Sequence, residues 1–295
     1  MTQLKTMFQG VKKFTFLIFI ALSICGSNLK AQNKVLIIGI DGCRPDALLK
    51  AETKNIDKLW KNGAYSFNAK TDEISSSGIC WTGMLTGVWH EKHRVVSNEY
   101  DNPNIGEYPH FFHRIKEQKP ELKTFSVVNW NPIHKILQEN DADYSAEFSN
   151  DKMVSKHVAK ILKHGDVDVM FVQLDHVDHA GHIYDYVSNS KKYLKAIKKS
   201  DIQVGEMVNV LKKRLNYKDE NWLIIVSTDH GGSDFGHGKD IPEHTTIFYI
   251  ASGNGVRKGE IEKQVNVIDV AVTALKHLGI EIKEDWKLDG KVAGF

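Results

Sequence analysis

Short apolar runs alternate along this chain with longer stretches in which apolar residues recur every three or four positions. The short runs predict buried strands at residues 34–40, 124–128, 167–174, 222–227 and 245–251. The longer stretches predict helices at residues 55–62, 78–86, 110–117, 151–163, 191–214 and 267–278. Such alternation is typical of α/β proteins, so we expect a doubly wound sheet with helices on both faces.

The first 31 residues have the pattern of an export signal rather than of a folded element. A lysine-containing start precedes an apolar run at residues 14–24, which is too short to span a bilayer comfortably. We expect cleavage after Ala31, export to the periplasm or beyond the cell, and no stable membrane insertion of the mature chain. A lipid anchor on Cys25 is the weaker alternative, because lipidation favours a small residue where this chain has Ile24.

Removing residues 1–31 changes the charge of the chain and the functions that its composition allows. The segment holds four lysines and no acid, so the formal charge moves from +2 to −2. The remaining 264 of 295 residues have no basic excess for nucleic-acid binding, and they suffice for a single catalytic domain at 32–295. Of the cysteines, Cys43 and Cys80 remain; they either pair in an oxidising compartment or stay as free buried thiols.

Carboxylates and imidazoles follow three of the predicted strands. In chain order these side chains are Asp41, Asp178, His182, Asp229 and His230. In open α/β sheets the carboxyl ends of the strands form the crevice that binds ligands, so we expect these side chains to meet there. Oxygen and nitrogen ligands without cysteine suit zinc, and less specifically manganese or iron. Taken alone, Asp41 is as well explained by capping the turn after its strand.

Further histidines leave the ligand set open. If the segment after 167–174 is helical, Asp178 and His182 project from one face, and a loop could also bring them together. Histidine content alone does not choose one ligand from that segment. The rival histidines are His176, His179, His237 and His244.

A nucleophile is expected at Ser77. It would lie at the start of the helix predicted at 78–86, where unpaired backbone N–H groups and the helix dipole favour an alkoxide or a bound phosphate. A nearby metal would lower the pKa of the hydroxyl and replace a general base. The alternative is that Ser77, or a neighbouring serine, only caps the helix.

Together these motifs resemble those of the alkaline phosphatase superfamily, and most closely those of the type I phosphodiesterase/nucleotide pyrophosphatase family. The similar segments are Ile40-Asp41-Gly42-Cys43-Arg44-Pro45-Asp46, Asn55-Ile56-Asp57-Lys58-Leu59 with Gly63-Ala64, Asp178 to His182, and Thr228-Asp229-His230-Gly231. The resemblance covers nearly all of residues 33–288. It implies an alkaline-phosphatase-like fold, a three-layer doubly wound mixed sheet flanked by helices, without a large cap domain.

The resemblance also assigns roles. The family spacing to Leu85-Thr86-Gly87 again selects Ser77 as the nucleophile. Asn98 occupies the position of an asparagine that binds a phosphate oxygen. Relatives more often have threonine followed by Phe-Pro-Asn, whereas this chain has Gly78-Ile79-Cys80 after Ser77. Sulfatases of the superfamily need a proline and an arginine after the modified residue, and this chain has neither there.

The resemblance implies two divalent metal ions, preferably zinc, that divide the candidate ligands between them. The first ion would be bound by Asp41, Ser77, Asp229 and His230. The second would be bound by Asp178, His182 and His237. His244 stays in reserve for the last position, because the spacing to the final histidine varies among relatives.

The expected function is hydrolysis of a small phosphate ester through a phosphorylated Ser77, with phosphodiesters and nucleotide pyrophosphates ranked first. Phosphomonoesters and phosphonates are alternatives on the same site, as is a non-catalytic binding protein on this fold. Residues 88–150 are the expected source of pocket walls. Six of their aromatic residues are available to stack on a base or an aromatic leaving group, although we expect most of the six to be core or surface filler: Trp89, Tyr100, Tyr108, Phe111, Phe112 and Trp130.

Overall fold

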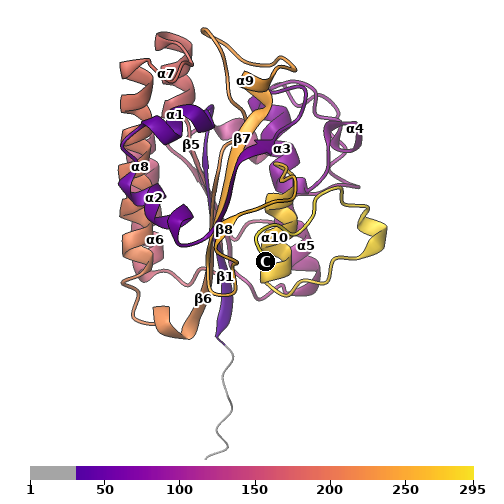
Figure 1. The fold of residues 1–295 in the computed structure, drawn as a ribbon. Coiled ribbons are helices and arrows are strands. Elements are labelled where there is room, and N and C mark those ends of the chain that lie inside the picture. The colour runs from indigo at the N-terminus through magenta and orange to yellow at the C-terminus, as the bar shows by residue number, and fades with distance from the viewer. Residues whose placement is uncertain (1–30) are drawn as a thin grey trace, which may run out of the picture. The chain divides into compact units, whose positions relative to one another are not determined.

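The computed structural model describes residues 31–295, and one mixed sheet runs through the middle of them (Figure 1). The strands in this part of the chain are β1 Gln32–Ile40, β2 Ala64–Lys70, β3 Thr124–Val128, β4 Tyr144–Glu147, β5 Val169–Leu174, β6 Glu220–Ser227, β7 Thr246–Gly253 and β8 Gly259–Glu260. Their order across the sheet is β4-β3-β5-β1-β6-β7-β2-β8. The strands from β4 to β6 are parallel, whereas β7 is antiparallel to both of its neighbours. The predicted doubly wound mixed sheet is confirmed.

Helices cover both faces of this sheet (Figure 1). One face carries α1 Pro45–Lys50, α2 Lys54–Lys61, α6 Asp151–His164, α7 His176–Tyr184 and α8 Lys191–Leu211. The other face carries α3 Ser77–Thr86, α4 His90–His93, α5 Phe111–Gln118 and α10 Asp269–His277. Shorter elements are α9 Pro242–Thr245 and the 3₁₀ helices η1 Asn131–Ile136, η2 Tyr217–Asp219 and η3 Glu284–Trp286. The three-layer arrangement is therefore as expected.

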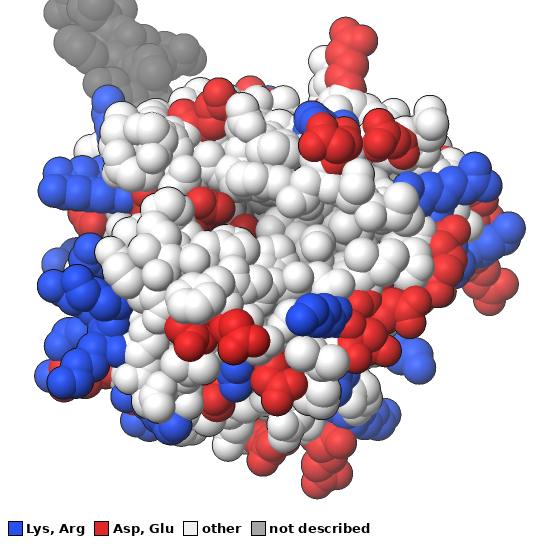
Figure 2. All heavy atoms as spheres, turned by 90° about the horizontal axis from the view of Figure 1, so that it is seen from above, with Lys and Arg blue, Asp and Glu red and all other residues white. Residues whose placement is uncertain are grey.

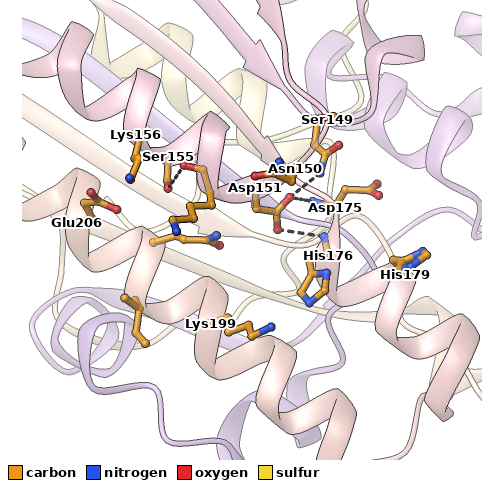
Figure 3. A pocket seen from close by; sticks show the side chains of 14 residues that line it. Ser149, Asn150, Asp151, Ser155, Lys156, Asp175, His176, His179, Lys199 and Glu206 are labelled. Atoms are coloured by element: carbon orange, nitrogen blue, oxygen red, sulfur yellow. Dashed lines mark hydrogen bonds between the residues drawn. The ribbon is translucent and has the colours of Figure 1, made fainter.

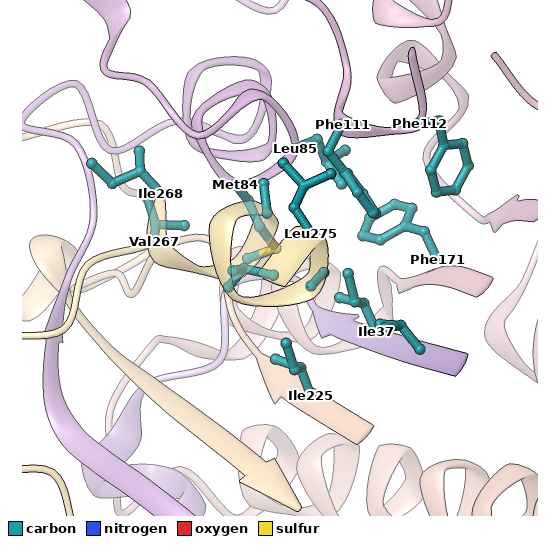
Figure 4. Close-up of a cluster of buried hydrophobic side chains, with 14 of the residues drawn as sticks. Ile37, Met84, Leu85, Phe111, Phe112, Phe171, Ile225, Val267, Ile268 and Leu275 are labelled. Atoms are coloured by element: carbon teal, nitrogen blue, oxygen red, sulfur yellow. The ribbon is translucent and has the colours of Figure 1, made fainter. Parts of the chain in front are cut away.

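Successive residues of the central strands point into two separate apolar cores. In β1, Ile37 packs toward α3, α5 and α10, a core shown in Figure 4, while Leu36 and Ile38 pack toward the helices of the opposite face. Because both faces are covered, β1 reads in the sequence as an unbroken apolar run. Helix α3 is buried at every residue. Its burial anchors the helix that begins at Ser77.

The five predicted strands are all present, with only their ends shifted. Three strands lie outside the predicted set: β2, β4 and β8. In β2 the large residues Tyr65 and Phe67 occupy the half-buried face, and small residues such as Ala64, Ser66 and Ala69 occupy the buried one. This inverts the usual hydrophobic alternation, so pairing with β7, rather than local pattern, fixes the strand. β4 and β8 are too short to leave a pattern.

The expected export signal at residues 1–31, with Cys25 inside it, falls outside the described residues except for Ala31, and it stays a prediction. Residues 31–295 form one compact unit, without a separate cap domain. No helix within that unit is long and apolar enough to cross a membrane.

Candidate active site

The candidate ligands after β1 and β6 converge on the imidazole of His230. The two strands pair in parallel, so Asp41 and Asp229 emerge at the same edge of the sheet. His230 Nε2 lies 3.4 Å from Asp41 Oδ1 and 3.4 Å from Asp229 Oδ2. It lies 3.2 Å from Ser77 Oγ. All four side chains are buried.

This arrangement fits a metal ion. Four atoms placed tetrahedrally ~2.0–2.1 Å from zinc are ~3.3 Å apart, which is close to the spacing between His230 and its three neighbours. Asp41 Oδ1 and Asp229 Oδ2 are buried and have no hydrogen-bond partner within residues 31–295. Buried carboxylate oxygens are normally paired, so a cation is the partner that both oxygens suit.

Ser77 opens α3, and its hydroxyl faces His230. The capping position belongs to Ser76, whose side chain makes no capping hydrogen bond within the described part of the chain. Instead, Gly78 N donates to Asn98 Oδ1 at 2.8 Å. A Cβ atom on Gly78 would lie 2.8 Å from the carbonyl oxygen of Ser97. The departure from the family pattern at Gly78 therefore lets the Asn98 loop reach the start of the helix.

The second group of ligands comes from α7 and from the loop after β6. Because α7 is helical, Asp178 and His182 lie one turn apart on the same face. His182 Nε2 lies 3.2 Å from Asp178 Oδ2, and His237 Nε2 lies 3.8 Å from Asp178 Oδ1. Asp178, His182 and His237 each offer an atom within 4.8 Å of the others. Asp178 also belongs to a second set of side chains, with Asp41 and His230, whose ligand atoms lie within 4.8 Å of one another, so it stands between the two groups.

The second group opens to solvent, whereas the first is closed. The side chain of His182 is 42 % exposed, while those of Asp229 and His230 are 0 % exposed. Figure 2 looks onto the carboxyl edge of the sheet and shows a hollow with acidic atoms inside it and mostly uncharged side chains around it.

Three histidines turn Nε2 toward the carboxylates and Nδ1 toward the backbone. Nδ1 of His182, His230 and His237 each lies 2.7 to 3.0 Å from a backbone carbonyl oxygen. A ring N–H donated to a carbonyl leaves Nε2 as the free ligand atom, which is the usual arrangement of metal-binding histidine. His244 uses both ring nitrogens in other hydrogen bonds, one of them as acceptor from a backbone N–H. The geometry favours His237 over His244.

Burial and charge shift the pKa values of these groups. Burial, followed by the neighbouring carboxylates, raises the pKa of Asp41 well above its usual value. Burial and Asp178 raise the pKa of Asp229 to about 7. Burial opposes ionisation of Asp178 as well, but the hydrogen bond with His182 and two further imidazoles lower its pKa to about 2. That hydrogen bond raises the pKa of His182 to about 9. Carboxylates crowded in a buried site indicate a site built for positive charge.

Two residues outside the expected set hold Asp41 in place. Trp81 Nε1 donates to Asp41 Oδ2 at 3.0 Å, and Gln173 Nε2 donates to the same oxygen at 2.9 Å. Trp81 follows Ser77 by one turn of α3, so one helix carries the candidate nucleophile and a support for a ligand. Gly39 makes room for the indole, because a Cβ there would lie 2.3 Å from the ring. The four-residue spacing from Ser77 to Trp81 is the signal in the sequence that points to this role.

The two histidines that compete with His182 lie elsewhere. His176 and His179 line a cavity of about 610 Å³ that is also lined by α6 and α8 (Figure 3). Neither belongs to a ligand group formed by the described residues. Asp151, at the edge of this cavity, accepts from the backbone N–H of His176 at 3.0 Å. It thereby fixes the start of the helix that carries Asp178.

The remaining candidates are not placed for chemistry. Cys43 and Cys80 are buried and free within residues 31–295, and burial raises the pKa of both thiols, which keeps them protonated. The aromatic residues of 88–150 behave mainly as core, as expected. Those that are buried are Tyr100, Tyr108, Phe111 and Phe112. Trp89 and Trp130 are half-buried against the same core.

Comparison with known proteins by sequence identifies both a family and individual relatives. The family described as type I phosphodiesterase / nucleotide pyrophosphatase has a model that matches residues 35–248. Bovine bis(5'-adenosyl)-triphosphatase ENPP4 is 23% identical over 226 residues, which cover 70% of this chain and 49% of the relative. The catalytic subunit of human GPI ethanolamine phosphate transferase 2 is 30% identical over 140 residues, or 46% of this chain and 14% of the relative. The chain thus spans at most about half the length of these curated relatives.

Solved structures share the fold. Murine ectonucleotide pyrophosphatase/phosphodiesterase 5 superimposes with a TM-score of 0.69 at 14% identity, covering 84% of this chain and 96% of that one. A 2-O GAG sulfatase superimposes with a TM-score of 0.71 at 12% identity, covering 90% of this chain and 73% of that one. The expected alkaline-phosphatase-like fold class is confirmed by this likeness, which at such identities concerns the fold alone.

Proposed function

Because this chain belongs to the type I phosphodiesterase/nucleotide pyrophosphatase family, we propose that it is a metal-dependent hydrolase of phosphate esters. Phosphodiester and nucleotide pyrophosphate bonds rank first, and phosphomonoesters and phosphonates rank second. One observation carries the proposal. His230 Nε2 lies 3.2 Å from the hydroxyl of Ser77, at the start of α3. It also lies 3.4 Å from each of two carboxylate oxygens, Asp41 Oδ1 and Asp229 Oδ2, that have no hydrogen-bond partner within the described residues.

Two divalent cations, preferably zinc, would be held by the two ligand groups. Asp41, Ser77, Asp229 and His230 would hold the first. Asp178, His182 and His237 would hold the second, leaving a position open to solvent. When bound, the ions lower the pKa of the serine hydroxyl and neutralise charge on the phosphate oxygens.

Ser77 Oγ, having lost its proton to solvent, attacks phosphorus in line. A bond forms between Oγ and phosphorus as the bond to the leaving oxygen breaks, and the leaving group takes a proton from solvent. Water then attacks the same phosphorus, the bond to Ser77 breaks, and the serine regains a proton. Asn98 Oδ1 is already engaged by Gly78 N, so the amide N–H groups of Asn98 are the atoms left to donate to a phosphate oxygen.

The names of the relatives support the substrate ranking. The bovine relative is named a bis(5'-adenosyl)-triphosphatase, and an inactive form of the murine structural neighbour was solved in complex with AMP. Both ligands are nucleotide phosphates. The human relative is named an ethanolamine phosphate transferase, so a diester without a nucleotide belongs in the same test.

A kinetic screen tests the proposal. Residues 32–295 are purified, loaded with zinc, and assayed on p-nitrophenyl esters of phosphate, of a phosphate diester and of a phosphonate, and on a dinucleoside polyphosphate. We expect the diester and the polyphosphate to be cleaved most efficiently, and Ser77→Ala to abolish turnover of each. Near-equal efficiencies would overturn the ranking. Absence of bound metal, together with no effect of Ser77→Ala, would leave a binding protein on this fold.

Export forms a second part of the proposal, supported by the charge and apolar pattern of residues 1–31. N-terminal sequencing of the protein from fractionated cells tests it. A periplasmic or secreted chain that begins at Gln32 is expected. A chain retained inside the cell with residues 1–31 intact, or one that begins at a lipid-modified Cys25, would contradict it.

A further inference from the structure

Tyr186 is a buried phenol that reaches each candidate ligand of the second ion. Its hydroxyl donates toward the backbone oxygen of Asp178 at 3.1 Å and toward Oδ1 of the same residue. Its ring meets the imidazole of His182 edge-on, with ring centres 5.4 Å apart, and that of His237 with ring centres 6.2 Å apart. The side chain is fully buried, although His182 beside it is open to solvent.

Two glycines close in sequence to His182 and His230 make space for this ring. A Cβ atom on Gly181, just before His182, would lie 2.3 Å from a ring atom of Tyr186. A Cβ atom on Gly232, two residues after His230, would lie 2.6 Å from the same ring. At both positions the three nearest atoms all belong to Tyr186. Neither glycine has a positive φ angle, so close approach of the ring, rather than backbone freedom, accounts for them.

The backbone of Tyr186 also holds the loop that leads to His237. Its N–H donates to the carbonyl oxygen of Asp234 at 2.8 Å. Phe235, which follows Asp234 in the loop, provides the carbonyl oxygen that lies 2.9 Å from His182 Nδ1. One residue therefore links the helix that carries Asp178 to the loop that carries the third ligand.

We propose that Tyr186 is the positioning residue of the second metal ion, an inference that rests on the metal site of the proposed function. By engaging Oδ1 of Asp178, the phenol leaves Oδ2, which lies 3.2 Å from His182 Nε2, as the oxygen for the ion. The ring fixes the two imidazoles from the side. Tyr186 lies four residues after His182 in the sequence. Hydrogen bonds to ligands from such supporting residues typically raise metal affinity ~10–100-fold.

Tyr186→Phe removes the hydroxyl and keeps the ring, and Tyr249→Phe is its matched control. Tyr249 is equally buried and donates to the carbonyl oxygen of Ala293 at 3.3 Å, away from the ligand groups. Zinc affinity and stoichiometry are measured by competition with a chromophoric chelator, and metal-free stability by urea unfolding. We expect Tyr186→Phe to bind one ion as the wild type does and the other ~10–100-fold more weakly. Tyr249→Phe should bind both ions normally, even where it loses similar stability.

The possible results separate this inference from the proposed function. Two ions bound equally well by wild type and Tyr186→Phe would overturn the positioning role and leave the proposed function standing. Equal weakening by both phenylalanine variants would also overturn it, because a general loss of stability would then explain the effect. A wild-type chain that binds no zinc would overturn both.

A double-mutant cycle tests the role of the ring itself. Gly181→Ala should weaken binding of the second ion when Tyr186 is present, because the new methyl group displaces the tyrosine ring. In a Tyr186→Leu background, the same substitution should add little further weakening, since the smaller side chain leaves room. Equal effects in the two backgrounds would show that the glycine does not serve the tyrosine.

Discussion

Replacing Asp229 with asparagine is expected to change the stability of the protein in opposite directions with and without metal. Asp229 is fully buried, and burial together with Asp178 raises its pKa to about 7, against an ordinary value of 3.8. A carboxyl group with a raised pKa in the folded protein stabilises the fold below pH 3.8. That contribution is lost as the pH rises through 7, where the folded protein must hold the charged form.

The two pKa values set the size of the effect. They differ by about 3, and each pKa unit corresponds to ~1.4 kcal/mol, so the buried charge costs on the order of 4 kcal/mol above pH 7. Asparagine keeps the shape of the side chain and removes the charge. Its Oδ1 can still accept the N–H of Gly42, which lies 3.2 Å from Asp229 Oδ1. Metal-free Asp229→Asn should therefore be more stable than the metal-free wild type at pH 8.

Zinc should reverse that order. An ion present at about a ten-thousandfold excess over its dissociation constant stabilises the folded state by ~5.5 kcal/mol, which exceeds the cost of the buried charge. Asp229→Asn loses this stabilisation, because the neutral amide is a much weaker ligand than the carboxylate. Urea unfolding at pH 8 and pH 5, with chelator or with zinc, measures all four states. The gain from Asp229→Asn should be large at pH 8 with chelator, shrink at pH 5, and become a loss with zinc.

A control aspartate makes the test specific. Asp201 is buried, but its carboxylate accepts backbone N–H groups at the start of α2. Asp201→Asn should destabilise the protein equally with chelator and with zinc. If Asp229→Asn behaves in the same way, Asp229 is an ordinary structural carboxylate and the reasoning about a cation site fails.

Three further predictions follow from the site and the core. His237→Ala should lower the affinity for one zinc ion by more than ~100-fold, because losing a ligand costs more affinity than losing a hydrogen bond that supports a ligand. His244→Ala should leave zinc affinity nearly unchanged. Calorimetric titration measures both, and equal losses would exclude His237 as the ligand. Asn98→Ala should lower kcat by ~10²–10³-fold, since a donor to the phosphate is lost. Asn98→Asp, which keeps the oxygen but not the donor, should do no better; steady-state activity equal to wild type in either variant would remove Asn98 from the site. His110→Asn should reduce the pH dependence of the free energy of unfolding below about pH 6.5. Burial lowers the pKa of His110 to about 3 from 6.5, so the unfolded chain binds the extra proton and stability falls by up to ~1.4 kcal/mol per pH unit below 6.5. Urea unfolding between about pH 4 and 7 that shows equal slopes for the two proteins would contradict this.

The central strands could be predicted because their burial on both faces requires apolar residues at neighbouring positions, which local sequence records. β1, β5 and β6 are covered on both faces and are dominated by apolar residues along most of their length. β2 shows the reverse of the usual strand pattern, because its aromatic residues lie on the half-buried face and its small residues on the buried face. Pairing with a strand distant in sequence decides such a case, and no window of local sequence contains that partner.

The candidate site divides in the same way. Asp41, Asp229 and Asp178 could be selected because they follow strand-like runs, and Ser77 because it begins a helix-like one. The groups that hold the ligands could not, because each acts by a hydrogen bond across the fold. Gln173 reaches Asp41 from another strand, and Tyr186 is recognised only by the space that two glycines leave for it. The choice of His237 over His244 depends on which ring nitrogen faces a backbone carbonyl, which sequence does not record.

The central claim is that two metal ions bind beside the hydroxyl of Ser77. Anomalous X-ray diffraction at the zinc edge, from a crystal of residues 32–295 grown with zinc, tests it most directly. We predict two peaks, one bounded by Asp41, Ser77, Asp229 and His230, and the other bounded by Asp178, His182 and His237. No peak in this group of residues, or a peak only beside His176 and His179, would contradict the account.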